Sequence, residues 1–570
     1  MKKIMNKACL AIAAVALTVS CSLNELNHSS VTSVDYIQGD AQYEELVNAA
    51  YMNLRPLYNS VSLDLMFYGT DLYQRIAELS SDTLIGVDDY DVITVSDGSV
   101  YSFWCDCYDI VTQCNIAMSR GEGITLSDQV KKARNAELQV LRAFAYFYLV
   151  ENFGGVPLLK EEITNPTFEF TRESEQNVYE FIVSELESAI NSGGLEQRVS
   201  TSNFGRIDQG CAHHLLGKVL LTRSYKSFAA ASDLSSAISH LQEALKIHPL
   251  VSDWDTLFDV FGGKYQNANS EIILAIRFAS DRSYNSVGNG FYELFKTDNL
   301  NVWPGLVPRD APYWRVDPSF RAADWYLTGF EDGDVRGSEK YLVRHLYAVE
   351  DGSVGGISFK GSRTYGEGDE IIYMPNEYLS EEEKAAYMAE HPTVYLVVTP
   401  DQYNTKFVVG NNSNMSPFVY KFMDPNISSY GGSVTEGVGD VGTRDITIFR
   451  SAETKLLLAE AYIKQGQPGL ALNEVNDIRD RAGASRLETV DLDVVLDEAG
   501  RELLGETNRW MDLKRCGKLF ERAYKYNPFV RKHNASSSAI KSDYLLRPIP
   551  KQEIERSNNT LEQNPGYSGS

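Results

Sequence analysis

The chain has 570 residues and an excess of acidic side chains, with 78 Asp and Glu against 53 Lys and Arg and a formal net charge of −25 at pH 7. This charge argues against a nucleic-acid-binding protein, because binding to phosphates requires a basic surface. It also argues against attachment to anionic lipids through the folded surface. The length is sufficient for a large hydrophobic core.

The first twenty residues have the composition of a secretory signal. A short basic region comes first, with Lys2, Lys3 and Lys7, and an apolar stretch rich in Ala follows from 8 to 19. This stretch is too short for a membrane-spanning helix, which needs about 20 apolar residues. Cleavage after residue 20 would remove three positive charges and no acid, so the mature protein would be more acidic still.

Cys21 makes this signal similar to that of a bacterial lipoprotein, in which cleavage occurs directly before a cysteine that then carries lipid. The residue before it is the small Ser20, although Thr18 stands where such signals usually have Leu. We therefore predict a signal peptide at 1–20, lipidation of Cys21 and a polar tether at 21–40. Several acyl chains would make the attachment effectively permanent. The alternative is an ordinary secretory signal that contains a cysteine by chance.

Helical periodicity dominates two parts of the mature chain, about 41–260 and about 445–525. The part between them, about 280–440, is rich in Gly, Pro, Tyr, Trp and Asn, which is typical of loops. We therefore predict a single folded unit at 41–570, in which a loop-rich insertion with a few short strands separates two helical blocks.

A tetratricopeptide pattern occurs in both helical blocks. In this pattern two antiparallel helices cross closely at small side chains, and Pro follows the second helix. The matching residues are Ala237, Leu241, Ala244 and Pro249 in the first block and Leu458, Ala459, Tyr462 and Ala471 in the second. Further helix pairs are expected at 41–57 with 101–120 and at 130–152 with 173–191. The predicted fold class is mostly α, with a tetratricopeptide-like helical-repeat scaffold and a loop-rich irregular lobe.

The motifs that could indicate an enzyme or a metal site are all incomplete. The run 437–442 spells a dinucleotide fingerprint, but a segment rich in Gly, Ser and Tyr precedes it where a strand is required. Cys105 and Cys107 lack the second ligand pair of a zinc site, and the cysteines after the signal are too few for a disulfide framework. Asp332 begins a run similar to a calcium loop, but Val343 stands where the closing Glu is needed. We therefore expect a protein that binds and does not catalyse, with no cofactor and no metal.

Short motifs along the mature chain resemble those of the SusD/RagB family. The longest match runs from Leu141 to Leu158, against the family motif LRA-x-x-YF-x-LV-x-x-FGGVPL. The other matches follow in the family's order, and they are Gly205-Arg206, Glu271-Ile272-Ile273, Asp334-x-Arg336, Arg450, Leu458-Ala459-Glu460-Ala461, Val475-Asn476-x-Ile478-Arg479-x-Arg481-Ala482-Gly483, Arg501-Glu502-Leu503, Gly505-Glu506, Arg509-Trp510-x-Asp512-Leu513, Pro548-Ile549-Pro550, Glu553-Ile554 and Leu561-x-Gln563-Asn564-Pro565-Gly566-Tyr567. The segment 280–440 departs from the family pattern, in the region where the family itself varies most.

Several of these motif residues are expected to have structural roles. Gly154 and Gly155 suit the end of a helix, and Pro157 cannot continue it. Trp510 is expected to lie in the core. The arginines expected to pair with buried acids are Arg142, Arg501 and Arg509, with Glu137, Glu502 and Glu506 as partners.

The resemblance implies a function in nutrient uptake. Members of this family are lipid-anchored proteins on the outer-membrane surface of Bacteroidetes, with a tetratricopeptide-like scaffold. They sit on a SusC-type TonB-dependent transporter and act as a lid that captures the ligand. Most bind oligosaccharides or polysaccharides, and RagB-type members bind peptides. The resemblance therefore predicts a glycan-binding subunit of such a complex, with a peptide-binding subunit as the alternative and a hydrolase as a more distant one.

Candidate ligand-binding residues lie in loops, because a sugar ring offers a flat apolar face that stacks on an aromatic side chain beside polar groups. The resemblance places ligand contacts near Trp314, near Tyr292 and in the loop at 82–90. The candidates are Trp314, Trp303, Tyr292, Arg309, Asp88, Asp89 and Tyr90. The acidic run that begins at Asp88 has two alternative interpretations, a solvated acidic loop and a cation site. Trp325 and Tyr326 follow a helical pattern and are expected in the core.

Overall fold

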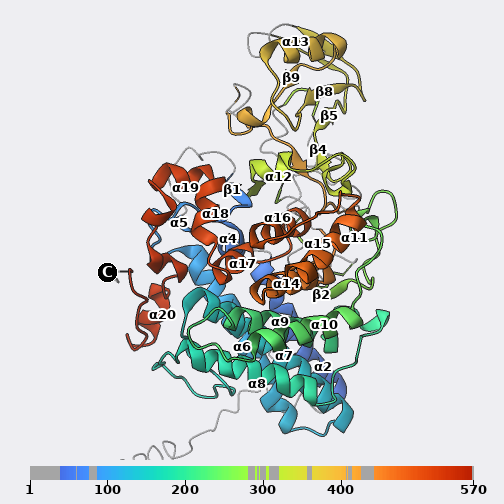
Figure 1. Cartoon of the computed structure of the whole chain (residues 1–570). Coiled ribbons are helices and arrows are strands. Elements are labelled where there is room, and N and C mark those ends of the chain that lie inside the picture. Colours follow the sequence, from blue (N-terminus) through green and yellow to red (C-terminus); the bar gives the residue numbers. More distant parts are fainter. Residues whose placement is uncertain are drawn as a thin grey trace, which may run out of the picture.

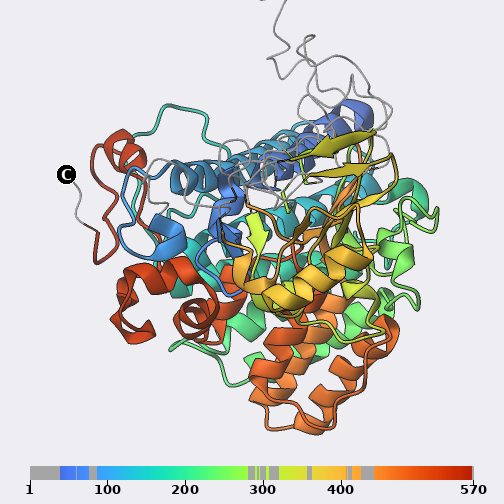
Figure 2. The same cartoon turned by 90° about the horizontal axis from the view of Figure 1, so that it is seen from above.

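The computed structural model of the chain describes residues 39–58, 61–75, 86–279, 289–291, 294–295, 303–306, 320–355, 362–405, 407, 414–424 and 442–567. In these residues the protein is mostly helical with a few short strands, as predicted (Figure 1). The helices stack in layers and form a scaffold. Residues 342–405 form a smaller lobe, which projects from one end of the scaffold and carries α13 (Glu381–Glu390) at its tip. Seen from above, the lobe lies over the helices (Figure 2).

The N-terminal part of the scaffold consists of long helices, four of which begin at a side-chain cap. They are α2 (Asp40–Met52), α6 (Gly98–Glu122), α7 (Asp128–Phe153), α8 (Glu175–Asn191), α9 (Gln209–Arg223) and α10 (Asp233–Ile247). The side chains of Asp97, Ser127, Ser174 and Asp208 precede α6 to α9 and accept hydrogen bonds from amides of the first turn. Shorter helices in this part are α3 (Leu54–Tyr58), α4 (Asp64–Phe67), α5 (Gly86–Asp89) and α11 (Asp255–Phe258).

Neighbouring long helices pack against each other in the order of a helical repeat (Figure 1). Helix α6 packs on α2 and α7, α8 on α7 and α9, and α10 on α9 and on α14 (Ser451–Lys464). Gly217 permits the close approach of α9 to α10, because a Cβ atom there would lie 2.7 Å from Cγ of Leu241. Leu241 belongs to the predicted repeat pattern, and Ala237 and Ala244 beside it are buried. The predicted tetratricopeptide-like packing is therefore confirmed.

The C-terminal part returns to the scaffold through a two-stranded sheet. Strand β2 (Ile272–Ile276) pairs antiparallel with β11 (Ile446–Arg450), and Ile272 lies opposite Arg450. The helices that follow are α14, α15 (Pro468–Ala482), α16 (Leu492–Leu503), α17 (Arg509–Arg515), α18 (Leu519–Tyr526), α19 (Pro528–His533) and α20 (Lys551–Arg556). Short 3-10 helices are η1 (Val61–Leu63), η2 (Thr201–Asn203), η5 (Val335–Gly337), η7 (Pro400–Gln402), η10 (Ser537–Ala539) and η11 (Ser542–Leu545).

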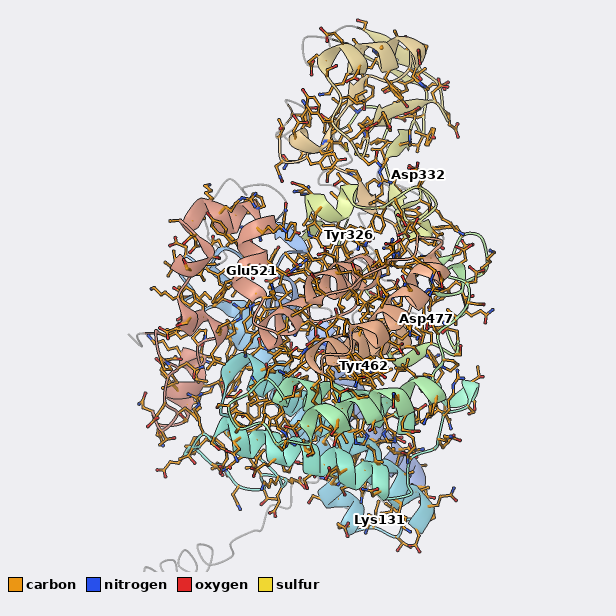
Figure 3. All side chains as sticks on the ribbon, viewed as in Figure 1. Lys131, Tyr326, Asp332, Tyr462, Asp477 and Glu521 are labelled. Carbon is orange, nitrogen blue, oxygen red and sulfur yellow. The ribbon has the colours of Figure 1, made fainter. Side chains whose placement is uncertain are left out.

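The lobe and its root contain short strands in small sheets. Strand β10 (Phe418–Val419) pairs with β4 (Leu342–Val343), and β8 (Glu370–Tyr373) lies between β5 (His345–Tyr347) and β9 (Leu396–Val397). The remaining pairs are β6 (Gly352–Val354) with β7 (Arg363–Tyr365) and β1 (Tyr73–Arg75) with β3 (Phe320–Ala322). Helix α12 (Asp324–Thr328) follows β3 at the root of the lobe, where Figure 3 labels Tyr326.

A network of buried arginines and carboxylates joins the root of the lobe to the C-terminal helices. Arg450 Nη1 lies 2.6 Å from Glu502 Oε1 and 2.7 Å from Glu271 Oε1. Arg336 Nη1 lies 3.1 Å from Glu502 Oε2, and Arg481 contacts Glu502 and Glu271 as well. Burial alone would raise the pKa of Glu502, but the three guanidinium groups hold it well below its usual range. These residues belong to the sequence motifs of the family resemblance, which therefore encode the network.

The arginines that were expected to pair with buried acids do so, with other partners than predicted. Arg142 pairs with Glu185, Arg501 with Glu498, and Arg509 with Asp71. The partners differ because a sequence motif shows which arginine needs an acid, whereas the acid comes from a helix or loop that only the packing brings near. Trp510 is fully buried, as expected.

Replacing Arg450 by Met should lower the free energy of unfolding by about 3–5 kcal/mol, because the buried Glu502 and Glu506 would lose the cation that they share. A fall in the thermal unfolding midpoint, followed by circular dichroism, measures the effect. The matched control is Arg486→Met, which removes a solvent-exposed pair with Asp480 and should cost less than about 1 kcal/mol. Equal midpoints for the two variants would contradict the role of the network.

Candidate ligand-binding site

The segments that carry the candidate residues are anchored at one edge of the β1–β3 sheet. The strands are antiparallel with Arg75 opposite Phe320, so the end of β1 lies beside the start of β3. The chain leaves the sheet after residue 75 and enters it before residue 320 at this same edge. The carbonyl oxygen of Leu294 also accepts a hydrogen bond from Phe320 N, at 3.0 Å. We call this place the β1–β3 edge.

The β1–β3 edge brings together sequence neighbours of the candidate residues. Tyr292 lies two positions before Leu294, and Arg309 and Trp314 lie in the segment that ends at β3. These three residues, and Cys21, lie outside the described residues, so their roles stay predictions. The described residues at the ends of these segments nevertheless lie next to each other, as a shared binding site requires.

A cluster of aromatic rings supports the β1–β3 edge from below. Phe67 stacks on Tyr73 with ring centroids 4.4 Å apart, and Phe320 meets Phe67 edge-on at 5.1 Å. Phe295 lies 5.8 Å from Tyr73. All four rings are buried, and such ring pairs add stability beyond the area that they bury.

The C-terminal helices hold β1 in place from the other side. Arg509 in α17 and Arg522 in α18 both contact Asp71, at 2.7 and 2.6 Å, two residues before β1 begins. The hydroxyl of Tyr73 accepts a hydrogen bond from Gly505 N at 2.7 Å. The position of the β1–β3 edge therefore depends on residues more than 400 positions later in the sequence.

The first two acids of the run at Asp88 are buried, which corrects its interpretation as an exposed loop. Asp88 and Asp89 lie in α5 with no solvent exposure. Arg75 Nε lies 2.8 Å from Asp88 Oδ2, and its Nη2 lies 3.3 Å from Asp89 Oδ2. Asn527 Nδ2 donates to Asp88 Oδ1 at 3.1 Å. These carboxylates hold Arg75 at the end of β1 and face the protein, not a ligand or a solvated cation.

Tyr90 is also structural, contrary to its prediction as a ligand contact. It adopts a left-handed backbone conformation with φ of 58° directly after α5. Its hydroxyl donates to the carbonyl oxygen of Gly69, and its ring packs edge-on against Phe520 at 5.1 Å. The ring is 2% exposed and offers no face to a sugar.

Trp303 is buried, so the prediction that it forms an exposed aromatic platform is wrong. Its ring is 1% exposed and meets Phe407 at 5.9 Å. The loop folds back onto the lobe, because Tyr395 donates to the carbonyl oxygen of Pro304 and Val349 N donates to that of Gly305. The Pro and Gly content of the loop suggested exposure, whereas contacts with distant parts of the lobe bury the ring.

Two sizeable open clefts lie among the described residues at places that the sequence did not predict. One of 610 Å³ lies between α6, the segment after α7 and α20, and its lining includes Tyr108, Phe168 and Arg556. The other, of 510 Å³, lies between α11 and the root of the lobe. We call the second one the lobe cleft. In the described part of the chain, no cluster of three or more His, Cys, Asp or Glu side chains is arranged to bind a metal ion.

Two family models together span most of the chain. The model described as SusD family matches residues 270–567, more than half of the chain. The chain belongs to the SusD family. A model described as starch-binding associating with outer membrane matches residues 23–199. The resemblance that the sequence motifs indicated is therefore confirmed.

Similar proteins of known name support this assignment over most of their length. Starch-binding protein SusD of Bacteroides thetaiotaomicron is 26% identical over 471 residues, which cover 81% of this chain and 77% of that protein. SusD-like protein P38 of Formosa agariphila is 24% identical over 547 residues, which cover 91% of this chain and 93% of that protein.

Solved structures of SusD-like proteins share the fold. A laminarin-binding SusD-like protein matches with a TM-score of 0.65 and 21% identity, over 93% of this chain and 100% of the other. Surface glycan-binding protein A from Bacteroides thetaiotaomicron, in complex with laminarihexaose, matches with a TM-score of 0.65 and 20% identity, over 92% of this chain and 100% of the other.

Replacing Arg75 by Met should make the stability of the protein more sensitive to pH. Burial raises the pKa of Asp88 to about 6, while Arg75 opposes this rise, so the variant should raise it further. A carboxyl whose folded pKa exceeds its unfolded value loses its stabilising contribution as the pH rises through the folded pKa. The free energy of unfolding of the variant should therefore equal that of the wild type near pH 4 and be about 2–3 kcal/mol lower by pH 8. This loss is smaller than that for a fully buried pair, because Arg75 is partly exposed.

Thermal unfolding midpoints at pH 4 and pH 8 test this expectation. The control is Arg556→Met, which removes an exposed pair with Glu553 and should leave both midpoints close to those of the wild type. A loss that is as large at pH 4 as at pH 8 would show that Arg75 stabilises through packing and not through its charge.

Proposed function

We propose that this chain is a surface lipoprotein that captures an oligosaccharide or polysaccharide and delivers it to a SusC-type TonB-dependent transporter in the outer membrane. The observation that carries the proposal is the β1–β3 edge, where the flanks of the predicted ligand-binding segments meet in a chain of the SusD family. The relatives named for starch and laminarin binding support a saccharide as the ligand.

Binding without catalysis is part of this proposal. Of the candidate residues in the described part of the chain, the acids Asp88 and Asp89 are committed to Arg75. They therefore do not form the pair of free carboxylates that saccharide hydrolysis requires.

Attachment to the membrane through lipid on Cys21 completes the proposal. None of the helices in the described part of the chain combines the length and the apolar character that crossing a membrane requires. The acidic composition gives no electrostatic attraction to anionic lipid. A lipid anchor and a polar tether at 21–40 would hold the protein at the surface and leave the scaffold free to contact a transporter.

Trp314→Ala should weaken saccharide binding about tenfold and leave the thermal unfolding midpoint unchanged, because we expect its ring to stack on a sugar and not in the core. Gel retardation by soluble starch, laminarin, xylan and galactomannan identifies the ligand, and calorimetry with its oligosaccharides measures the affinity. Trp303→Ala is the matched control, since this buried ring should cost about 3–5 kcal/mol of stability when removed. An unchanged affinity of the Trp314 variant would show that Trp314 does not contact the saccharide.

Binding of peptides but of no glycan would favour a peptide-binding subunit.

Cys21→Ser should release the protein from the membrane, because the variant lacks the thiol to which the lipid would be attached. In cells that express the protein with its signal, the wild type should be in the outer-membrane fraction and incorporate labelled palmitate, and the variant should do neither. The control is Cys516→Ser, which changes a thiol within the folded part of the chain. A variant at Cys21 that stays in the membrane fraction would contradict the lipid anchor.

A further inference from the structure

The lobe cleft is formed by three segments that lie far apart in the sequence. They are the turn after α11 with Phe261, the segment from Glu339 to Tyr347, and Tyr420 at the end of β10. The volume of 510 Å³ lies within the about 300–1,000 Å³ that small-molecule sites occupy. In Figure 1, α11 lies at the right of the scaffold below the lobe, and β1 lies on the other side of the lobe's root.

Strand β10 separates the lobe cleft from the β1–β3 edge. Val419 N donates to the carbonyl oxygen of Phe295, which belongs to the aromatic cluster under the edge. The next residue, Tyr420, lines the lobe cleft, and its backbone N donates to the carbonyl oxygen of Tyr341. The two places are therefore distinct surfaces on opposite sides of one short strand.

Two aromatic side chains in the lobe cleft are about half exposed to solvent. Phe261 is 50% exposed and Tyr347 is 44% exposed. The ring of Phe261 stacks on that of Tyr420 with centroids 5.6 Å apart and an angle of 23° between the planes. Two nearly parallel rings beside a third exposed ring form the kind of apolar platform on which the C–H face of a sugar packs.

Lys340, which lines the lobe cleft, and the nearby Lys264 are neutralised by carboxylates. Lys340 Nζ lies 2.9 Å from Asp255 and 2.6 Å from Asp259. Lys264 Nζ lies 3.0 Å from the same Asp255, and 3.4 Å from Asp253. These carboxylates outnumber the two lysines, so the surroundings repel an anionic ligand such as a uronate or a sulfated sugar. The chemistry therefore favours a ligand without charge.

Polar groups that can form hydrogen bonds with sugar hydroxyls also line the lobe cleft. Glu339 lines the cleft, and its Oε1 accepts hydrogen bonds from the backbone N atoms of Arg344 and His345, at 2.9 and 2.8 Å. These bonds fix the orientation of the carboxylate, whose other oxygen can accept from a sugar hydroxyl. His345 is held in turn by Glu370, at 2.8 Å from its Nδ1, and its imidazole also lines the cleft.

We infer that the lobe cleft is a second saccharide-binding site, which takes neutral sugar units through Phe261, Tyr420 and Tyr347. This inference rests on the proposed function, and it adds that one saccharide chain is bound at two places on the protein. Contacts at two places strengthen the binding of a long chain through effective concentration, whereas a short oligosaccharide occupies each place separately.

The double variant Phe261→Ala with Tyr347→Ala tests the second site. Both rings are largely exposed, so the unfolding midpoint should stay close to that of the wild type. Gel retardation by soluble starch, laminarin, xylan and galactomannan should fall at least fivefold for whichever polysaccharide retards the wild type. Calorimetry with the corresponding hexasaccharide should show fewer sites per protein in the variant than in the wild type.

The control is Phe168→Ala, which removes a ring that is 58% exposed in the other cleft and should leave retardation unchanged. Retardation of the double variant equal to that of the wild type would overturn the second site and leave the proposed function intact. A wild type that none of these polysaccharides retards would contradict the proposed function, and the second site with it. Retardation by polygalacturonate that requires Phe261 and Tyr347 would overturn the assignment to neutral sugars.

Discussion

A buried carboxylate surrounded by arginines is the interaction on which the rest of the structure depends. Glu502 in α16 contacts Arg336 at the root of the lobe, Arg450 at the end of β11 and Arg481 in α15. A charged side chain is stable in the protein interior only beside its partners, because the burial of an unpaired charge has a large desolvation cost. The network therefore permits one relative arrangement of the C-terminal helices, the β2–β11 sheet and the root of the lobe.

Both surfaces that we propose for ligand binding follow from this arrangement. Asp71 is held by Arg509 and Arg522, and this places β1 and the β1–β3 edge against the C-terminal helices. On the other side of β10, the root of the lobe meets the turn after α11 and forms the lobe cleft. A change in the angle of the lobe would alter both surfaces together, so the charge network sets the geometry of both proposed binding surfaces.

The candidate site shows how far reasoning from sequence reaches. The described flanks of the predicted segments meet at the β1–β3 edge, and the roles of Tyr292, Arg309 and Trp314 stay predictions. Individual side chains were harder to assign, because Trp303 and Asp88 are buried although their neighbours are typical of exposed loops. Sequence showed that Arg509 needed an acid but not that Asp71, more than 400 residues earlier, would supply it. The lobe cleft escaped prediction entirely, since no local pattern connects Phe261 with Tyr420.

The sequence by itself determined the class of fold and the family. Helical periodicity and the spacing of small residues such as Ala237 are local properties of the sequence. Neighbouring helices that have them pack in a repeat, whichever segments follow later in the chain. Only the tertiary structure decided which side chains face solvent. Burial depends on segments that arrive from far along the chain, as Asn527 does for Asp88 and Phe407 does for Trp303. A binding surface is a property of that packing, and for this reason a candidate for it such as the lobe cleft emerges only from the fold.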